Sequence, residues 1–324
     1  MLPLQEKRQP EQEMFRRQWL AMRAERECSK AEMFHLRSRF FVSNLTRRLL
    51  KAFWLGLGRL GLHGWPLARV ARIELREHTC HFADLPAAFA GYRILHLSDI
   101  HIDVRPQVAD DIARRIRDVQ PDLVVMTGDF RDGYTYPFED LVPSIRHMIS
   151  TVQPPDGFLA VLGNHDPAAA VPLLESLGIR VLLQESVEIV RGRDRLVLTG
   201  LDDVVAFGRP DSMKPFFSRP PGFAVALVHS PCGYRAAAAA GYRLYLTGHT
   251  HGGQVCLPGG IPLMLHTRAP RSFCNGRWNF GRLQGYTNTG AGTSGIPLRV
   301  NCPPVVGLIT LQTGPDQDPF SRSG

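Results

Sequence analysis

Short apolar runs alternate with amphipathic stretches between residues 92 and 161. A run of about four to eight apolar residues is typical of a buried strand, whereas apolar residues three and four apart indicate a helix packed on a core. The sequence predicts strands over residues 92–97, 123–127 and 158–161, with helices over residues 106–119 and 139–151. This alternation favours an α/β architecture in which loops at the strand ends form a functional edge.

Beyond Gly178 the apolar runs follow one another closely, which indicates a succession of strands. The predicted strands cover residues 181–183, 187–190, 196–200, 223–228 and 244–247, and residues 286–288 and 305–311 are expected to complete a second sheet. One helix is expected around residues 236–240. The main domain is therefore predicted to span residues 73–312, followed by a disordered polar tail over residues 313–324.

The first 50 residues have a different pattern. Residues 5–50 are charged and contain no glycine and a single proline, and their spaced apolar residues predict one or two amphipathic helices. Residues 49–70 are richer in Leu, Phe, Trp and Gly, but their longest uncharged run, residues 60–68, is much shorter than the ~20 residues that a spanning helix needs. A membrane-spanning helix is therefore not predicted.

Charge is distributed unevenly along the chain. The formal net charge is +8, but residues 1–72 alone carry 15 Lys/Arg and 6 Asp/Glu, whereas the remaining residues are close to neutral. A basic amphipathic segment can lie in the headgroup region of an anionic bilayer. We expect residues 1–72 to associate peripherally with the cytoplasmic face of the inner membrane. The alternative is that this segment packs on the main domain. No nucleic-acid partner is expected, and the sequence does not indicate the oligomeric state.

Two features bear on the compartment. Residues 46–51 (TRRLLK) resemble a twin-arginine export signal, but 45 residues precede them and Arg59 interrupts the following apolar stretch. The six cysteines show no paired spacing, so free thiols in a reducing compartment are expected, and three disulfides in an exported chain are the alternative.

Five polar clusters follow the predicted strands. Their chemically useful residues are Asp99 and His101, Asp129, the run Asn164-His165-Asp166, His229, and the pair His249 and His251. Because the ends of neighbouring strands meet at one sheet edge, these side chains can converge. Asp99 and His101 can hold one metal ion, Asp129 can bridge two, and Asn164 can bind the second. Mixed Asp, Asn and His ligands favour Mn²⁺, with Fe²⁺ or Zn²⁺ as alternatives, over Mg²⁺ or Ca²⁺.

His165 has a different expected role from the ligands around it. It directly follows a ligand and precedes Asp166, which could orient it, so we expect His165 to stabilise charge at phosphorus and to protonate the leaving oxygen. The expected nucleophile is a water or hydroxide that bridges two cations.

These clusters resemble the calcineurin-like metallophosphoesterase family, whose motifs read D-x-H, G-D, G-N-H-[DE], H and G-H-x-H. The similarity covers about residues 90–312. It implies a four-layer αββα sandwich of two mixed sheets and His165 as the catalytic histidine. The implied ligands are Asp99, His101, Asp129 and His251 for one metal and Asp129, Asn164, His229 and His249 for the other.

Within the family the chain looks like a membrane-associated bacterial branch that includes UDP-2,3-diacylglucosamine pyrophosphatases. The glycine-rich segment 289–295 supports this, whereas Pro303-Pro304-Val305 departs from a Pro-Glu pair of relatives. Our leading hypothesis is a dinuclear-metal phosphohydrolase that cleaves a lipid-linked substrate, UDP-2,3-diacylglucosamine, to lipid X and UMP in lipid A biosynthesis. The alternatives are a phosphodiesterase or phosphatase for soluble nucleotides and a non-catalytic membrane scaffold.

Overall fold

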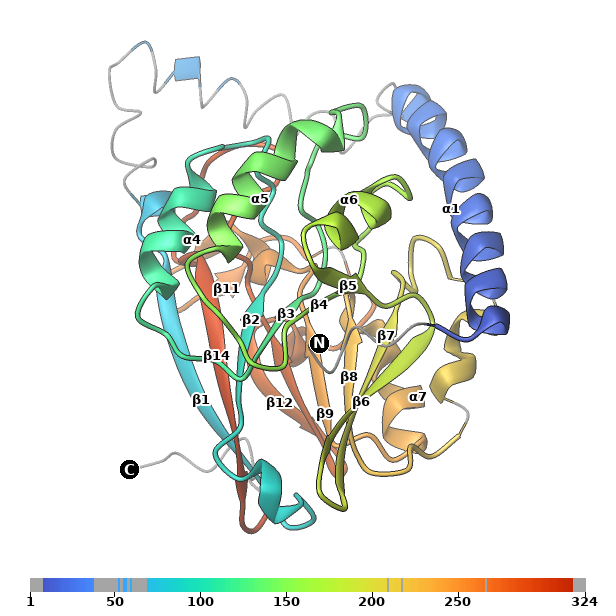
Figure 1. Ribbon diagram of the computed structural model, residues 1–324. Helices are drawn as coiled ribbons and strands as arrows, with labels where there is room; N and C mark the ends of the chain where they lie inside the picture. The colour runs from blue at the N-terminus through green and yellow to red at the C-terminus, as the bar shows by residue number, and fades with distance from the viewer. Residues whose placement is uncertain are drawn as a thin grey trace.

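Two six-stranded mixed sheets form the centre of the protein (Figure 1). The computed structural model describes residues 8–37, 52, 55, 56, 59, 69–208, 210–216, 218–265 and 267–316. Its α-helices are α1 (Pro10–Arg37), α4 (Val108–Ile116), α5 (Val142–Ile149), α6 (Ala170–Ser176) and α7 (Tyr234–Ala239). Short 3₁₀ helices are η2 (Ala87–Phe89), η3 (Phe138–Leu141), η4 (Pro210–Phe216), η5 (Pro231–Gly233), η6 (His251–Gly253) and η7 (Arg271–Phe273).

The first sheet has the strand order β1-β14-β2-β3-β4-β5. Its strands are β1 (Glu74–Phe82), β14 (Val305–Thr313), β2 (Arg93–Leu97), β3 (Leu123–Met126), β4 (Phe158–Ala160) and β5 (Ile179–Val181). Strands β2 to β5 run parallel, β14 is antiparallel to β2, and β1 is parallel to β14. The carboxyl ends of β2, β3 and β4 therefore meet at one edge of the sheet.

The second sheet has the order β12-β13-β9-β8-β7-β6, and a separate two-stranded ribbon pairs β10 with β11. The strands are β6 (Glu185–Arg191), β7 (Asp194–Leu201), β8 (Phe223–Val228), β9 (Leu244–Thr247), β10 (Cys256–Leu257), β11 (Ile261–Pro262), β12 (Gly276–Phe280) and β13 (Leu283–Thr287). Strands β7, β8, β9 and β13 are parallel, and the two edge strands are antiparallel to their neighbours.

Buried side chains divide into three layers that explain how the sheets stack. One cluster joins side chains of both sheets, such as Ile94 and Val125 with Val225 and Leu244, and so lies between them. A second covers the outer face of the first sheet with α4, α5 and α6, and a third covers the second sheet with α7 and η4. These layers confirm the predicted four-layer αββα sandwich.

Most predicted elements are present, but two strands were assigned to the wrong sheet, and helix α6 and strands β1, β10, β11 and β12 were not predicted. Residues 305–311 were expected in the second sheet, but β14 lies in the first sheet between β1 and β2. Residues 181–183 were also assigned to the second sheet, whereas β5 extends the first sheet beside β4. Strand β1 was not predicted, because five of the nine residues of Glu74–Phe82 are Glu, Arg or His and only Cys80 and Phe82 are buried.

Helix α1 packs against the main domain along one face, at the right of Figure 1. Arg16, Trp19 and Arg23 are buried, and Arg8 and Arg16 pair with Glu175 at 2.9 and 2.6 Å. One face of residues 8–27 in the basic segment thus packs on the main domain, whereas Met14 and Arg17 are exposed. The predicted second amphipathic stretch and the twin-arginine-like residues 46–51 lie outside the described residues. Among the described residues, no helix combines the length and apolar composition required to cross a bilayer.

The disordered tail was predicted to cover residues 313–324, but its predicted start lies within β14. Strand β14 continues to Thr313, and Asp316 accepts hydrogen bonds from the Ala83 N–H and, at 2.6 Å, from Arg243. Residues 313–316 are therefore held at the surface of the main domain, because Asp316 bonds to Ala83 and Arg243 after the apolar strand has ended. Residues 317–324 lie outside the described residues.

Candidate active site

The ends of five strands deliver the predicted ligands to one place between the two sheets. Asp99, Asp129 and Asn164 follow β2, β3 and β4 of the first sheet, and His229 and His249 follow β8 and β9 of the second. These strands are neighbours within their sheets. Residues separated by up to 152 positions in the sequence, Asp99 and His251, therefore come into contact.

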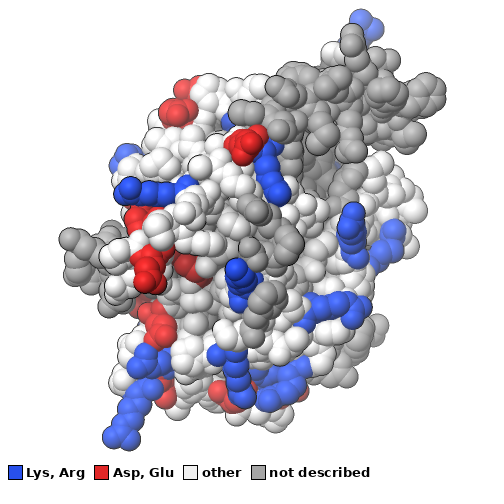
Figure 2. Space-filling view, turned by 90° about the vertical axis from the view of Figure 1, so that its right-hand side faces the viewer, with Lys and Arg blue, Asp and Glu red and all other residues white. Residues whose placement is uncertain are grey.

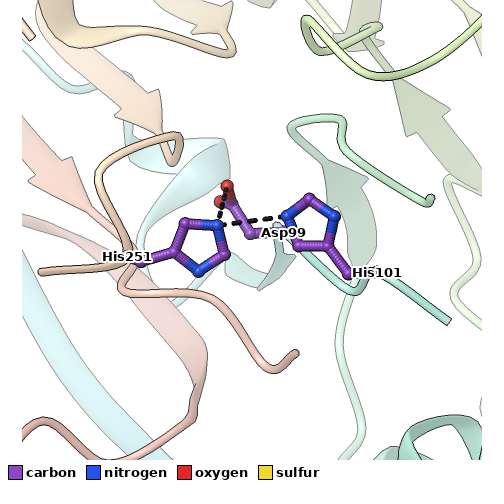
Figure 3. Close-up of side chains that lie close together, drawn as sticks. All are labelled: Asp99, His101 and His251. Carbon is purple, nitrogen blue, oxygen red and sulfur yellow. Dashed lines mark hydrogen bonds and ion pairs between the residues drawn. The ribbon is translucent and has the colours of Figure 1, made fainter. Parts of the chain in front are cut away.

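The first group of ligands consists of Asp99, His101 and His251, which point toward one another in Figure 3. The Nε2 atoms of His101 and His251 lie 3.1 Å apart, and His251 Nε2 lies 3.4 Å from Asp99 Oδ1. All three residues are buried. Three potential metal-binding atoms thus face one small volume that is shielded from solvent.

The second group consists of Asp129, His229 and His249 and is completed by Asn164. His229 Nε2 lies 3.2 Å from Asp129 Oδ2 and 3.2 Å from Asn164 Oδ1. His249 approaches the same amide oxygen with Nδ1 at 2.9 Å. Carboxylate, amide and imidazole atoms converge here in the combination that the sequence predicted.

Asp129 lies between the two groups. Its Oδ2 atom is 3.2 Å from His229 Nε2 in the second group and 3.8 Å from His101 Nε2 in the first. Its Oδ1 atom accepts a hydrogen bond from the His165 backbone N–H at 2.9 Å, which fixes the carboxylate. A single carboxylate is thus held where it can serve two cations.

Backbone carbonyls fix the ring nitrogens of two histidines. His101 Nδ1 lies 2.9 Å from the Arg131 carbonyl oxygen, and His229 Nδ1 lies 2.6 Å from that of Thr127. Because a carbonyl oxygen only accepts, each Nδ1 carries a proton and donates, which leaves the Nε2 lone pair facing the site in the neutral ring. In this arrangement the Nε2 atom of each histidine can bind a metal ion.

Electrostatics set the charge states of the site. Burial alone would raise the pKa of Asp129, but attraction to His229 and His165 outweighs it and holds that pKa well below its usual value. Burial lowers the pKa of His249, and repulsion from His229 lowers it further. Burial and the neighbouring His101 lower the pKa of His251 well below its usual value. Burial alone would lower the pKa of His229, but attraction to Asp129 outweighs it and holds that pKa well above its usual value. Ionised Asp129 and neutral His249 and His251 are therefore in the states that bind metal, whereas the His229 ring would lose a proton on binding a cation.

The backbone is strained at the ligands themselves. Five of the proposed ligands have positive φ values, namely Asp99 at 49°, His101 at 45°, Asp129 at 58°, His249 at 71° and His251 at 50°. Each such residue costs of order 1–3 kcal/mol, and this kind of strain concentrates at functional sites. The fold therefore tolerates unfavourable backbone conformations in order to aim these side chains inward.

Close backbone approach explains the glycines that precede two ligands. A Cβ atom on Gly128 would lie 2.3 Å from the Gly163 nitrogen, and one on Gly163 would lie 2.1 Å from Asp129 Oδ1. Gly128 also has a φ of +88°. Only glycine allows the loops after β3 and β4 to touch, and this contact brings Asp129 beside Asn164.

His165 lies at the edge of the first group, with its ring 5.4 Å from that of His101. Its Nδ1 donates to the Asp132 carbonyl oxygen at 2.6 Å, so Nε2 is the atom that remains for a substrate. The ring of Tyr134 stacks on His165 at 4.9 Å. Tyr134 could not be selected from the sequence, because it lies in a loop outside the five motifs.

Asp166 does not have the predicted contact with the His165 ring. Its carboxylate accepts hydrogen bonds from the backbone N–H groups of Asp129, Phe130 and Gly163, all within 2.8 Å. The side chain turns toward the loop after β3, where unpaired N–H groups require an acceptor. Asp166 therefore holds two ligand-bearing loops together, and the Asp132 carbonyl oxygen orients His165 in its place.

The glycine-rich segment 289–295 wraps around the loop that carries Asp99. The Gly292 N–H donates to the Asp99 carbonyl oxygen at 2.9 Å, and a Cβ on Gly292 would lie 1.8 Å from the Ile100 oxygen. Arg299 is fully buried behind it and donates to the carbonyl oxygens of Thr289 and Gly292, each at 2.7 Å. Arg299 Nη2 also lies 3.4 Å from His251 Nδ1. The sequence did not identify Arg299, since an arginine that binds mainly backbone oxygens belongs to no recognisable motif.

The residues present fit a pair of divalent cations. Two groups of carboxylate and imidazole atoms, each with its members within 4.8 Å of one another, share Asp129 as a neighbour. Nitrogen and oxygen donors in this mixture suit Mn²⁺, Fe²⁺ or Zn²⁺. Asp99, His101 and His251 would hold one cation, and Asn164, His229 and His249 the other, with Asp129 between them.

Comparisons with known proteins agree with this geometry. A family model described as calcineurin-like phosphoesterase matches residues 92–253. The chain is 30% identical over 255 residues to the uncharacterized metallophosphoesterase YkuE of Bacillus subtilis (strain 168), an alignment that covers 74% of this chain and 86% of that relative. It is 28% identical over 259 residues to an uncharacterized metallophosphoesterase of Aquifex aeolicus (strain VF5), covering 74% and 92% of the two chains. It is also 28% identical over 257 residues to phosphodiesterase YaeI of Escherichia coli (strain K12), covering 73% and 87%.

Proposed function

Since the chain belongs to the calcineurin-like phosphoesterase family and is a metal-dependent phosphoester hydrolase, we propose that it uses two cations to cleave a lipid-linked phosphoester or pyrophosphate. One observation supports a reaction that uses two cations. The Asp129 carboxylate lies between two groups of ligands, with His165 at the border. Two cations bound there would polarise the phosphoryl oxygens and acidify a water molecule for attack on phosphorus.

The protein's own residues contribute proton transfer and positioning. His165 has its Nδ1 proton engaged by the Asp132 carbonyl oxygen, so Nε2 in the protonated ring donates to the leaving oxygen as the bond to phosphorus breaks. Arg131 holds the His165 carbonyl oxygen through Nε at 2.8 Å, which fixes the backbone of that residue. The stacked ring of Tyr134 limits rotation of the imidazole. Proton donation from a fixed ring requires no covalent intermediate with the enzyme.

Our proposed substrate is UDP-2,3-diacylglucosamine, which would be cleaved to lipid X and UMP in lipid A biosynthesis. Arg8, Arg16 and Arg23 pair with carboxylates of the main domain. The remaining excess of basic residues in residues 1–72 supports an anionic membrane as the place of reaction. Figure 2 shows basic side chains spread across the face that carries α1, with most of the acidic ones toward its left side. The corresponding location would be peripheral, on the cytoplasmic face of the inner membrane.

Soluble phosphodiesters are the second candidate class of substrate. The relative in Escherichia coli carries the name phosphodiesterase, and a nucleotide diester needs no membrane surface. The chemistry at the two cations would be the same for both classes. The two classes of substrate differ in whether catalysis depends on an apolar surface along which a lipid reaches the site.

A substrate panel tests the proposal. The metal-free full chain is loaded in turn with Mn²⁺, Fe²⁺, Zn²⁺ or Mg²⁺ and assayed on UDP-2,3-diacylglucosamine, on bis(p-nitrophenyl) phosphate and on cyclic and linear nucleotides. We expect UMP release from the lipid to be fastest, with Mn²⁺ the best activator. Cleavage of soluble diesters with an intact lipid would reject the substrate and leave the reaction class standing. No hydrolysis of any member with any metal would reject the reaction class as well.

A further inference from the structure

A two-stranded ribbon beside the candidate metal site presents an apolar face to solvent. Strands β10 and β11 pair so that Leu257 lies opposite Ile261 and Cys256 opposite Pro262. The ribbon begins five residues after His251, and the backbone of Gly253 touches it: a Cβ there would lie 2.3 Å from Pro262 Cβ. The ribbon is therefore attached directly to the loop that carries a proposed ligand (β11 in Figure 1).

The two faces of the ribbon differ in burial. Side chains alternate along a strand, and Cys256 and Pro262 turn toward the main domain, where Cys256 is 3% exposed. On the other face Leu257 is 48% exposed, Ile261 56% and Leu263 61%. The whole run of residues 255–265 (VCLPGGIPLML) contains no charged, amide or hydroxyl side chain. Solvent-facing positions of a ribbon normally carry polar side chains, so this surface is adapted to something other than water.

Exposed apolar side chains are concentrated at this ribbon. Ten large hydrophobic residues are exposed in the part of the chain that the structure describes, and four of them lie within residues 257–264. The others are scattered, among them Val190 on β6 and Val205 after β7. Single exposed hydrophobic residues are common, but four within eight positions form a patch.

Cationic groups accompany the apolar face. The Arg271 guanidinium donates from Nη2 to the Pro262 carbonyl oxygen at 2.9 Å, which places a positive charge against the ribbon. Arg268, three residues earlier, is also exposed. An apolar surface bordered by guanidinium groups matches the boundary between acyl chains and anionic headgroups. A protein partner would be expected to meet polar groups able to form hydrogen bonds, which the side chains of this face lack.

We propose that the outward face of the β10–β11 ribbon enters an anionic lipid bilayer and holds the metal site at the headgroup level. Leu257 is six residues from His251, which limits their separation to about 20 Å of extended chain. A lipid phosphate could therefore approach the cations without leaving the bilayer completely. This inference rests on the proposed lipid-linked substrate and specifies the surface that recognises its membrane.

Vesicle binding by the full chain tests the ribbon directly. The variant Leu257→Ser/Ile261→Ser/Leu263→Ser is compared with the control Val190→Ser/Val205→Ser, which removes similarly exposed apolar side chains elsewhere. Sedimentation uses phosphatidylglycerol–phosphatidylethanolamine vesicles without substrate, at low salt and at about 1 M salt, where the Debye length falls to about 3 Å and purely electrostatic attachment is screened. We expect high-salt binding to fall about tenfold or more in the ribbon variant and to stay at the wild-type level in the control.

A second measurement tests the proposal even if the triple serine variant does not fold. Ile261→Trp should be quenched by brominated lipid above the background of the native tryptophans, whereas Val190→Trp should not. Equal vesicle binding by the ribbon variant and its control, or equal quenching at the two positions, would overturn the proposal. So would a wild-type chain that binds no vesicles but self-associates through the ribbon, since the occupant would then be a second copy. Vesicle binding needs no turnover, so its failure leaves the hydrolase activity untouched and can be told apart from a failure of catalysis.

Discussion

Arg23 of helix α1 donates a hydrogen bond from Nη2 to the carbonyl oxygen of Gly163 at 2.8 Å. The same Nη2 donates to the Asp166 carbonyl oxygen at 2.7 Å, so one guanidinium spans the backbone on either side of Asn164 and His165. Arg23 is completely buried, pairs with Asp202 and lies over the Phe207 ring at 3.8 Å. Through Arg23, helix α1 therefore holds in place the loop that carries Asn164, a proposed ligand, and His165, the proposed proton donor.

Replacing this arginine should affect both stability and catalysis. Arg23→Met leaves Asp202 buried without its partner, which typically costs about 3–5 kcal/mol of unfolding free energy. The loop also loses its donor, so we expect kcat to fall by about 10–100-fold, the usual effect of removing a group that orients metal ligands. Urea unfolding and steady-state kinetics on a soluble diester measure the two effects.

Two further variants separate these effects. Arg23→Met/Asp202→Asn removes both charges while an amide oxygen remains for Trp19 Nε1, which donates to Asp202 at 2.9 Å. Most of the stability should return and kcat should stay low. Arg17→Met on the exposed side of the same helix, where Arg17 pairs with Glu13 at 3.5 Å, should change stability by less than about 1 kcal/mol. Full recovery of kcat in the double variant would contradict a positioning role for Arg23.

The ligands could be predicted from the sequence because each follows an apolar run that reads as a buried strand. The order of such strands along the chain is enough to bring their ends together, provided that neighbouring strands are parallel. The role of Arg23 could not be predicted in this way. Arg16 and Arg23 look like the solvated side of an amphipathic helix until their carbonyl and carboxylate partners, more than 100 positions away, are known.

The position of β14 could not be predicted for a similar reason. Val305–Thr313 is apolar enough for the centre of either sheet, and no local signal distinguishes a place between β1 and β2 from a place in the second sheet. The hydrogen bonds of Asp166 to backbone N–H groups could not be predicted either. Asp166 and His165 are adjacent in the sequence, which suggested that their side chains pair, but the turn of the backbone separates them. Strand type is a local property, whereas strand order and side-chain partners depend on tertiary packing.

His165→Asn should impair turnover without emptying the metal site. An amide N–H can replace Nδ1 as the donor to the Asp132 carbonyl oxygen, but it cannot transfer a proton to a leaving oxygen. We expect kcat to fall by about 10²–10⁴-fold on a diester with an alkyl leaving group, the range for loss of a general acid. The loss should be much smaller with p-nitrophenol, which leaves without protonation. Equal losses on both substrates would rule out His165 as the proton donor, and bound metal per chain is the control for an intact site.

Asp129→Asn should remove the link between the two cations. The amide keeps the shape of the side chain but loses the negative charge that His229 and His165 stabilise. We expect less than two metal ions per chain by elemental analysis and a fall in kcat of at least about 10²-fold, the scale for removal of one preorganised electrostatic group. Asp110→Asn, which changes an exposed carboxylate on α4, is the matched control. Two tightly bound ions and normal turnover in Asp129→Asn would show that this carboxylate does not bridge.

Two glycines of segment 289–295 offer a matched pair of substitutions. A Cβ on Gly292 would collide with the Ile100 oxygen and press on the loop that carries Asp99, whereas one on Gly295 would meet nothing within 4 Å. We expect Gly292→Ala to lose about 1–3 kcal/mol of stability, as in other overpacked sites. Its affinity for one of the two metal ions should also fall. Gly295→Ala, with φ at +75°, should lose about 1–2 kcal/mol from backbone strain alone and keep both ions. Titration with Mn²⁺ decides between these outcomes.

His96 should make the protein less stable in acid. It is fully buried on β2, its Nε2 lies 2.8 Å from Thr127 Oγ1, and burial lowers its pKa to about 3. An unfolded histidine titrates near 6.5, so between about pH 6.5 and pH 3 the unfolded chain binds a proton that the folded chain does not. The resulting stability is present above pH 6.5 and is lost as the pH falls, at about 1.4 kcal/mol per pH unit.

Going from pH 7 to pH 5 should therefore cost about 2 kcal/mol through His96 alone. His96→Gln keeps a polar side chain that cannot be protonated, so its unfolding free energy should drop by about 2 kcal/mol less than that of the wild type over the same interval. Urea unfolding of the metal-free chains at both pH values makes the comparison without metal release. Parallel losses in His96→Gln and the wild type would mean that the His96 ring accepts a proton in the folded protein as readily as in the unfolded chain.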